Sequence, residues 1–231
     1  MTGLFPGGVA VTDLEVYDWE AADGCRGGSP HLHTASSEGY VVGGGSGAVQ
    51  TLSAAGFEEH PLVPGDVVWF TPGTVHRLIN GGDLRLLVVM ANAGLPEAGD
   101  AVLTFPADVL DDPEAYATAA AVTPGDEAAA RARRDLALDG FAQLRAGGAD
   151  ALAAFHARAV RIVQPRIAGW RELWESTVAA ETTRVGEQLT ALAAGDPGRM
   201  ATASVTRAQP RSAARTLGVC GRLRTWEWPA G

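Results

Sequence analysis

Four residues in the N-terminal part of the chain have the types and spacing of metal ligands. His31 and His33 are separated by one residue, Glu38 follows shortly after them, and His76 comes just after a turn. On a strand, residues i and i+2 point to the same face, so a strand over His31–His33 would turn both imidazoles to one side. The segment after His33 can bend and return the Glu38 carboxylate. Three imidazoles and one carboxylate suit Fe, Mn, Ni, Co, Cu or Zn and leave open positions on an octahedral ion.

These residues fall in a part of the chain that predicts β-structure. Up to about residue 110, short apolar runs alternate with turn-forming segments rich in glycine. Many short strands with regular turns are typical of a sandwich or a barrel. The expected strands cover residues 9–17, 31–42, 47–52, 67–70, 75–79 and 84–90.

Two blocks of this region have a longer pattern. They read His31-x-His33-x4-Glu38-x6-Gly45 and Gly65-x7-Gly73-x2-His76-x3-Asn80. The blocks resemble the two signature motifs of the cupin superfamily, and the resemblance covers about residues 25–92. The sequence departs from these motifs at two positions. Thr71 stands where the motif has a proline, and the glycine that should precede His31 (Gly27 or Gly28) lies one or two positions early. Neither departure is at a ligand position.

The resemblance implies a mainly β fold, a double-stranded β-helix or jelly-roll barrel of the cupin_2-like kind. It implies one divalent transition metal (Fe, Mn, Ni, Co, Cu or Zn) in the barrel mouth. Its ligands would be His31, His33, Glu38 and His76. Strand alternation counted from these ligands predicts further residues that would contact a substrate, although a shift by one residue would reverse every face. They are Tyr40 or its neighbour on the same face Val42, Trp69 or the adjacent Phe70, and Arg77, Met90 and Asn92.

The second part of the chain predicts helices. We expect a barrel over residues 1–110, a helical extension over 111–203, and a tail over 204–231 that packs back on the barrel. Asp126 is a candidate N-cap, Gly147-Gly148 a candidate helix end, and Pro165 should kink or break the helix that contains it. The apolar stripe of this extension must be buried. We expect a homodimer interface first and a lid over the barrel mouth second.

Composition excludes several classes of function. The 231 residues carry a formal net charge of −9 and contain no lysine, so Schiff-base and P-loop lysine chemistry is absent. An acidic chain does not favour nucleic acid or an anionic membrane as a partner. Cys25 and Cys220 are far apart and no export signal is evident, so we expect free thiols and a cytoplasmic location.

The two remaining histidines are expected outside the metal site. His60 follows two glutamates, and we expect it to be solvated in a turn between strands. His156 lies on the flank of the helical stripe and is expected at a surface or an interface.

We therefore expect a metal-dependent enzyme that acts on a small organic molecule. The first reading is a dioxygenase-type oxidoreductase, because the ligand set is similar to that of cupin dioxygenases and the expected lining is apolar. The second is a sugar or sugar-acid isomerase or epimerase, in which Glu38 is the candidate catalytic carboxylate that moves a proton. The third is a non-catalytic module that binds a small molecule.

Overall fold

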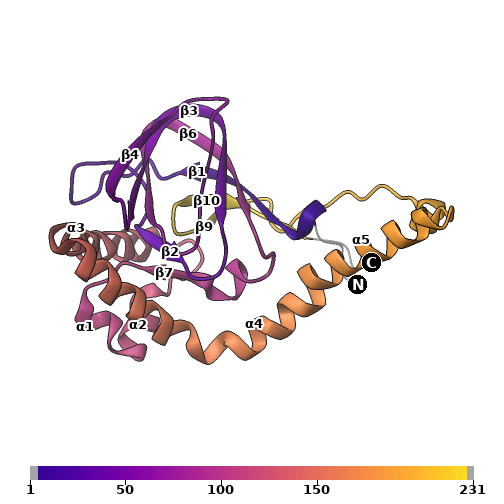
Figure 1. Ribbon diagram of the computed structural model, residues 1–231. Helices are drawn as coiled ribbons and strands as arrows, with labels where there is room; N and C mark the ends of the chain where they lie inside the picture. Colours follow the sequence, from indigo (N-terminus) through magenta and orange to yellow (C-terminus); the bar gives the residue numbers. More distant parts are fainter. Residues whose placement is uncertain (1–4, 228–231) are drawn as a thin grey trace.

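The computed structural model describes residues 5–227, which form a β-barrel flanked by helices on one side, with a long helical arm projecting from it (Figure 1). The barrel strands follow one another along the first hundred residues, as the alternation of apolar runs and turns predicts. They are β1 (Ala10–Val16), β2 (His31–His33), β3 (Glu38–Ser53), β4 (Gly56–Leu62), β5 (Val67–Phe70), β6 (Val75–Met90) and β7 (Ala101–Leu103).

Strands β3 and β6 form the framework of the barrel. They pair antiparallel from Glu38 opposite Met90 to Leu52 opposite Val75, with register shifts near Gly45. Gly45 has a φ of +72°, and a Cβ atom there would lie 2.2 Å from the carbonyl oxygen of Asp83. Only glycine fits such a backbone approach, so the sheet bends at this point and the two halves of each long strand face each other.

The barrel closes around one apolar core. Alternate residues of β1, β3 and β6 fill it, with Leu14, Tyr40 and Leu86 among its least exposed members. Asn80 stabilises the turn within β6, because its Oδ1 accepts hydrogen bonds from the backbone N–H groups of Gly82 and Leu84. Strand β4, which sequence analysis did not anticipate, extends the sheet beside β3.

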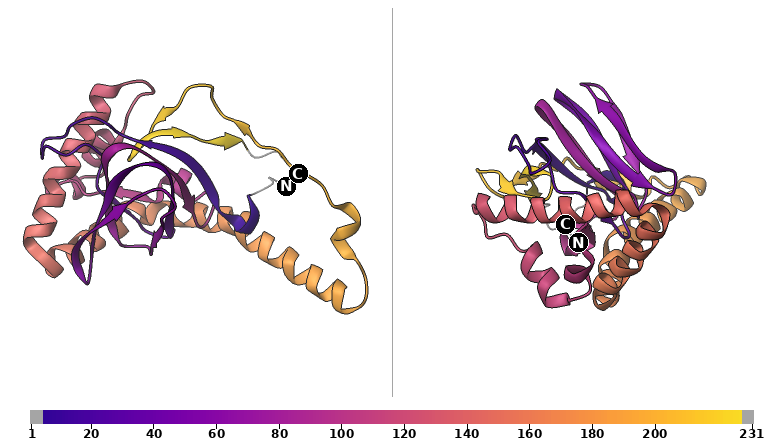
Figure 2. Two further views of the ribbon diagram at one scale, coloured as in Figure 1. Left: turned by 90° about the horizontal axis from the view of Figure 1, so that it is seen from above. Right: turned by 90° about the vertical axis from the view of Figure 1, so that its left-hand side faces the viewer.

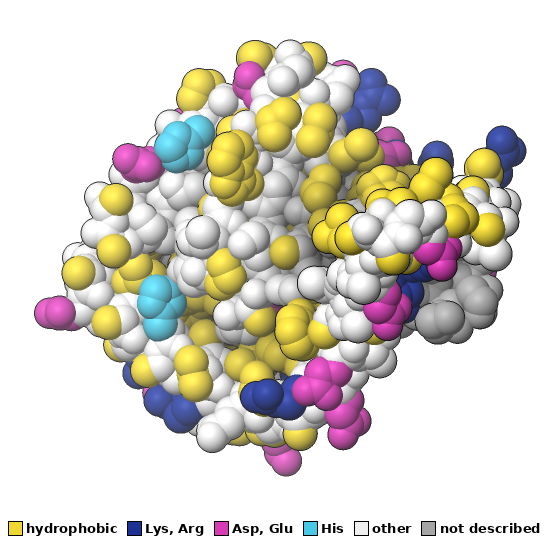
Figure 3. Space-filling model, turned by 45° about the vertical axis from the view of Figure 1, so that its right-hand side comes forward, with side chains coloured by type: hydrophobic (Ala, Val, Ile, Leu, Met, Phe, Trp, Pro, Cys, Tyr) yellow, Lys and Arg dark blue, Asp and Glu magenta, His cyan; other side chains and the backbone are white. Residues whose placement is uncertain are grey.

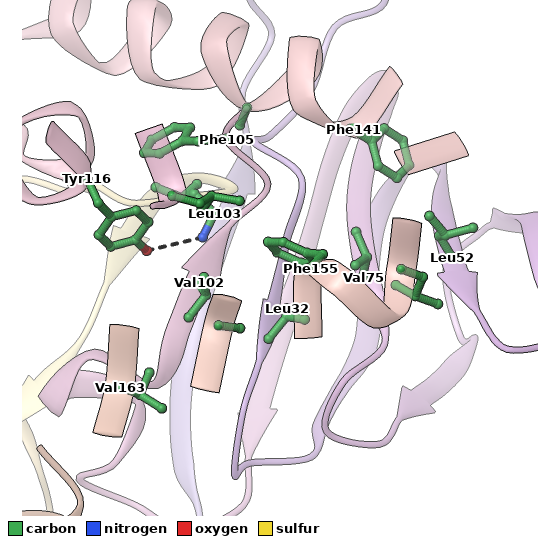
Figure 4. Close-up of a cluster of buried hydrophobic side chains, with 14 of the residues drawn as sticks. Leu32, Leu52, Val75, Val102, Leu103, Phe105, Tyr116, Phe141, Phe155 and Val163 are labelled. Atoms are coloured by element: carbon green, nitrogen blue, oxygen red, sulfur yellow. Dashed lines mark hydrogen bonds between the residues drawn. The ribbon is translucent and has the colours of Figure 1, made fainter. Parts of the chain in front are cut away.

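A second core lies between the barrel and the helices (Figure 4). It joins Leu32 of β2 and Val75 of β6 to Phe141 and Phe155 of a long helix. Tyr116 closes one end by accepting a hydrogen bond from the backbone N–H of Leu103. The helices are α1 (Ala107–Leu110), α2 (Pro113–Ala120), α3 (Glu127–Val163), α4 (Ile167–Trp174) and α5 (Ala180–Ala193).

Helix α3 begins where the sequence predicts and is kinked where the sequence predicts a helix end. The Asp126 side chain caps it by accepting a hydrogen bond from the backbone N–H of Ala129. Gly148 interrupts the helix where the sequence predicts a helix end, because its φ of +63° and ψ of −147° are non-helical and kink α3 into two helical segments. At Pro165 the chain forms the short 3-10 turn η3 (Gln164–Arg166) before α4, as expected of proline within a helix.

The arm consists of α4, the π-helical turn η4 (Glu175–Ala179) and α5. Its outer half carries exposed apolar side chains (Figure 3), namely Val185, Leu189 and Leu192. From its end the chain returns to the barrel (Figure 2), where β10 (Gly221–Arg224) pairs antiparallel with β1 and with β9 (Thr216–Leu217). Two short strands, β8 (Gln209–Pro210) and β11 (Trp226–Glu227), pair with each other. Within residues 5–227, no helix has the length and apolarity needed to span a membrane.

Candidate metal centre

Three strands bring His31, His33, Glu38 and His76 together inside the barrel. His31 and His33 come from β2, Glu38 begins β3, and His76 follows the first residue of β6. Strand β2 pairs with β6 so that His31 lies directly opposite His76. One ligand atom from each of the four residues lies within 4.8 Å of all the others. All four side chains are buried, with at most 8% exposed.

The separations of the donor atoms fit a bound metal ion. Glu38 Oε2 lies 3.1 Å from His33 Nε2 and 3.0 Å from His76 Nε2, and His76 Nε2 lies 3.2 Å from His31 Nε2. Two ligands about 2.1 Å from one ion and at right angles to each other would be about 3 Å apart. The cluster therefore has the spacing of adjacent positions around a single ion.

The hydrogen bonds behind two rings direct their lone pairs into the cluster. His31 Nδ1 donates to the backbone carbonyl of Ser29 at 2.9 Å, and His76 Nδ1 donates to that of Thr74 at 3.1 Å. A carbonyl oxygen can only accept, so Nε2 of each neutral ring carries a lone pair. In the neutral form of both rings these two lone pairs would face each other at 3.2 Å, and a cation between them would relieve the repulsion. The residues present therefore fit a divalent transition metal.

The third ring, His33, is backed by a carboxylate. Asp100 is fully buried at the end of the π-helical turn η2 (Pro96–Asp100), and its Oδ2 lies 3.6 Å from His33 Nδ1. Backbone N–H groups of Thr34, Ala35 and Ser36 donate to this carboxylate at 2.7, 2.8 and 2.9 Å. These donors and His33 hold the pKa of Asp100 below its usual range although burial alone would raise it. Asp100 therefore stays ionised behind the His33 ring.

The charges within the cluster reinforce one another. Burial raises the pKa of Glu38, but the neighbouring His76 and His33 outweigh it and hold that pKa well below its usual range. Burial and the two nearby imidazoles lower the pKa of His31, so this ring is neutral. Burial would also lower the pKa of His33, yet Asp100 and Glu38 raise it to about 9. The cluster thus offers one carboxylate anion and at least one neutral imidazole to a cation.

Two of the predicted substrate residues lie near the cluster. Met90 is opposite Glu38 in the β3–β6 pairing, and Tyr40 is fully buried two residues along β3. Burial and the Glu38 carboxylate raise the pKa of Tyr40, so its hydroxyl is protonated. Trp69 lies on β5 with 74% of its surface exposed. Between these strands Phe70 packs against His76, with ring centroids 4.2 Å apart.

The other two predicted substrate residues have partners elsewhere. Arg77 is buried behind β6, where its guanidinium forms an ion pair with Asp23 and donates to the carbonyl of Gly28. Asn92 follows β6, and its side chain donates to the carbonyl of Ala35 and accepts from the Trp174 indole N–H. The structure therefore does not bring these two residues to the cluster.

Sequence reasoning missed two residues beside the site. His60 is not in a turn but in β4, where it lines a cavity together with Trp69 and Phe70. The short turn over residues 53–56, which ends in glycine and follows the strand expected over 47–52, is the signal that could have located it. Asp100 had no such signal, because it reaches the cluster through a loop. His156 lies on α3 with Nε2 2.8 Å from the carbonyl oxygen of Gly73, at the interface between helix and barrel.

Comparison with known proteins defines the class of this domain. Residues 18–90 match the family profile described as a cupin domain. The chain therefore contains a cupin domain, built on a large antiparallel sheet and followed by a helical C-terminal region. The four clustered residues all lie within the matched segment.

Several solved structures resemble part of the chain. A variant of Streptomyces PAC13 with uridine is 20% identical, with a TM-score of 0.33 over 43% of this chain and 70% of that one. The KdgF protein of a Halomonas species is 15% identical, with a TM-score of 0.32 over 42% of this chain and 82% of that one. A double-stranded β-helix protein from Klebsiella pneumoniae is 18% identical, with a TM-score of 0.32 over 40% and 75% of the two chains. A search of curated proteins found no match.

Proposed function

We propose that this protein is a metal-dependent enzyme of the dioxygenase type that acts on a small organic molecule. The observation that supports this proposal is the convergence of three imidazoles and one carboxylate inside a barrel, with one ligand atom of each within 4.8 Å of all the others and three of the separations between 3.0 and 3.2 Å. A redox-active divalent ion held there would supply electron transfer and Lewis acidity.

The surroundings of the cluster favour redox chemistry over hydrolysis. Glu38 is flanked by Met90 on one neighbouring strand and by Phe70 on the other. The Phe70 ring also covers His76, so apolar side chains exclude bulk water from two ligands. A dry apolar site concentrates an uncharged gas such as O₂ and protects reactive species from water.

The first experiment measures the metal content of protein purified without added metal. We expect close to one Fe, Mn, Ni, Co or Cu per chain and consumption of O₂ in the presence of substrate candidates. The His76→Ala variant should lose the metal, whereas His156→Ala, a matched histidine outside the cluster, should keep it. Protein that neither retains a metal nor takes one up on reconstitution would refute the proposal and leave a binding module.

A second candidate is a metal-dependent isomerase or epimerase. The observation that favours it is His60, which lies in hydrogen-bonding distance of Thr51 at a cavity beside His76 and could move a proton there. One Zn per chain without O₂ consumption would support this candidate over the first.

A further inference from the structure

A cavity of about 400 Å³ lies between the edges of β4 and β5, next to the metal cluster. Three of its lining residues also touch or neighbour His76. Thr51 is opposite His76 in the β3–β6 pairing, the Thr74 carbonyl accepts the His76 Nδ1–H, and the Phe70 ring packs on the His76 ring. A molecule in this β4–β5 cavity would thus contact residues that touch or neighbour His76, while the four clustered residues themselves do not line the cavity.

One wall of the cavity is polar. His60 Nε2 lies 3.3 Å from Thr51 Oγ1 and 3.5 Å from the carboxylate of Glu58. The Ser53 hydroxyl adds a further group on the same wall. Hydroxyls and a neutral imidazole can each donate and accept, which suits ligand hydroxyl or carbonyl groups.

The opposite wall is apolar and aromatic. It is formed by β5, with Phe70 toward the cluster and Trp69 toward the surface. Trp69 keeps 74% of its surface exposed, and exposing so large an apolar side chain to water is unfavourable. A flat ring entering the cavity would cover it and gain its contact area.

The charge of the cavity selects against anions. Of the residues that line it, Glu58 is the acid, and none is an arginine although the chain has 18 cationic residues. A phosphate or carboxylate placed here would meet a carboxylate and no balancing guanidinium.

From these contacts we propose that the β4–β5 cavity binds the substrate, and that this substrate is an uncharged, flat molecule bearing hydroxyl or carbonyl groups. His60 and Thr51 hydrogen-bond its oxygens, Trp69 and Phe70 contact its ring, and Glu58 discriminates against anionic analogues. This inference rests on the proposed function, because it assigns the substrate class of the same metal centre.

The test compares two probes that differ by one carboxylate. Catechol is the uncharged probe and protocatechuate is its carboxylated analogue. Both are titrated by calorimetry into protein loaded with Zn, which undergoes no redox chemistry, and into metal-free protein. We expect catechol to bind about tenfold more tightly than protocatechuate, since one unit of like-charge repulsion near a surface is worth about 1 kcal/mol or more. The Glu58→Gln variant should narrow this difference.

Variants of the two walls locate the binding. His60→Ala and Trp69→Ala should each weaken catechol about tenfold, as expected for one lost hydrogen bond or ring contact. Glu59→Gln is the matched control, because Glu59 pairs with Gln50 and does not line the cavity. Circular dichroism checks that each variant is folded. We expect that it is, because the side chains of His60 and Trp69 are both partly exposed.

The inference is overturned if protocatechuate binds as tightly as catechol, or if the His60 and Trp69 variants bind catechol like the unaltered protein. Its failure is distinct from that of the proposed function. If the protein retains metal but the cavity variants bind catechol as the unaltered protein does, the substrate assignment is refuted and the enzyme proposal stands. Cavity-dependent binding by a protein that cannot hold metal refutes the enzyme proposal and keeps the cavity as a ligand site.

Discussion

Oδ2 of Asp100 lies 3.6 Å from Nδ1 of His33, on the side of the ring that faces away from the other three clustered residues. The carboxylate cannot shift easily, because backbone N–H groups of three consecutive residues, 34–36, donate to it. Its charge therefore faces the Nδ1 side of the His33 ring from a fixed position. A carboxylate behind a metal-binding histidine also raises the basicity of the ligand.

The Asp100→Asn variant should bind Zn about 10- to 100-fold more weakly, the usual effect of losing a carboxylate behind a histidine ligand. Competition against a chromophoric chelator measures this affinity directly, without an activity assay. The matched control is Asp66→Asn, since Asp66 accepts a hydrogen bond from the Val63 N–H in an exposed turn away from the cluster. Unchanged Zn affinity in a folded Asp100→Asn protein would show that Asp100 only stabilises the loop.

The contrast between Asp100 and the four clustered residues shows how far the sequence alone reaches. His31 and His33 share a face because strand periodicity is fixed by covalent geometry, and Glu38 and His76 follow at spacings that resemble a known motif. Asp100 approaches Thr34 across 66 residues of intervening chain. No local periodicity encodes a contact of that kind, because loop packing decides it.

Strand β6 and helix α3 show two further reasons why the sequence alone does not predict the whole of the site and the fold. Alternation along a strand places Arg77 on the face opposite His76, and the structure pairs its guanidinium with Asp23 there. At Gly148 the predicted helix end is confirmed as a kink, which divides α3 into two helical segments. The sequence could not show that Phe141 and Phe155, one on each segment, would pack in the same core, because that packing joins parts of the chain that are far apart in sequence.

The three tyrosines of the chain should titrate later in the folded than in the unfolded protein. Burial raises the pKa of Tyr17 to about 12, although nearby Arg133 and Arg222 act in the opposite direction, and burial also raises those of Tyr40 and Tyr116. Because the folded-state pKa of Tyr17 is raised, this group contributes stability that is fully present below about pH 10 and is lost as the pH rises through 12, and the raised pKa values of Tyr40 and Tyr116 act in the same direction.

Tyrosinate absorbance measures this titration, and the absence of lysine leaves few other groups that titrate in the same range. We expect the curve for native protein to lie at higher pH than the curve in guanidinium chloride. Coincident curves would mean that the tyrosines are solvated. The Tyr17→Phe variant should remove the component near pH 12.

Arg134 should be one of the strongest links between the helices and the barrel. Its guanidinium is 1% exposed and donates to the carbonyls of Trp19 and Glu20 at 2.9 and 2.8 Å. Arg134→Met leaves both carbonyls without these donors, so we expect the free energy of unfolding to fall by about 2–4 kcal/mol. Chemical denaturation measures the change.

The control for that variant is Arg161→Met, which removes an arginine that is 59% exposed and paired with Asp111. Exposed pairs contribute little, so its effect should stay below about 1 kcal/mol. Equal destabilisation by the two variants would contradict the role assigned to Arg134.

Helix α3 should also support strand β2, which carries two of the four clustered residues. Leu32 lies between His31 and His33, so its side chain points away from the cluster and joins the outer core, where Phe155 is packed (Figure 4). Phe155→Ala should lower the free energy of unfolding by about 3–5 kcal/mol, as expected for a large cavity in a core. Val160→Ala, on the same helix but 59% exposed, should change it by less than about 1 kcal/mol.

The same pair of variants distinguishes a supporting helix from an independent lid. If α3 supports β2, the Phe155→Ala protein should also bind Zn more weakly, because the strand that carries two ligands loses its packing on one side. A lid that packs loosely over the barrel would leave both the denaturation midpoint and the Zn affinity of that variant unchanged. Measuring the denaturation midpoint and the Zn affinity on the same samples therefore shows whether the packing of the helical region, transmitted through Leu32, affects the clustered residues.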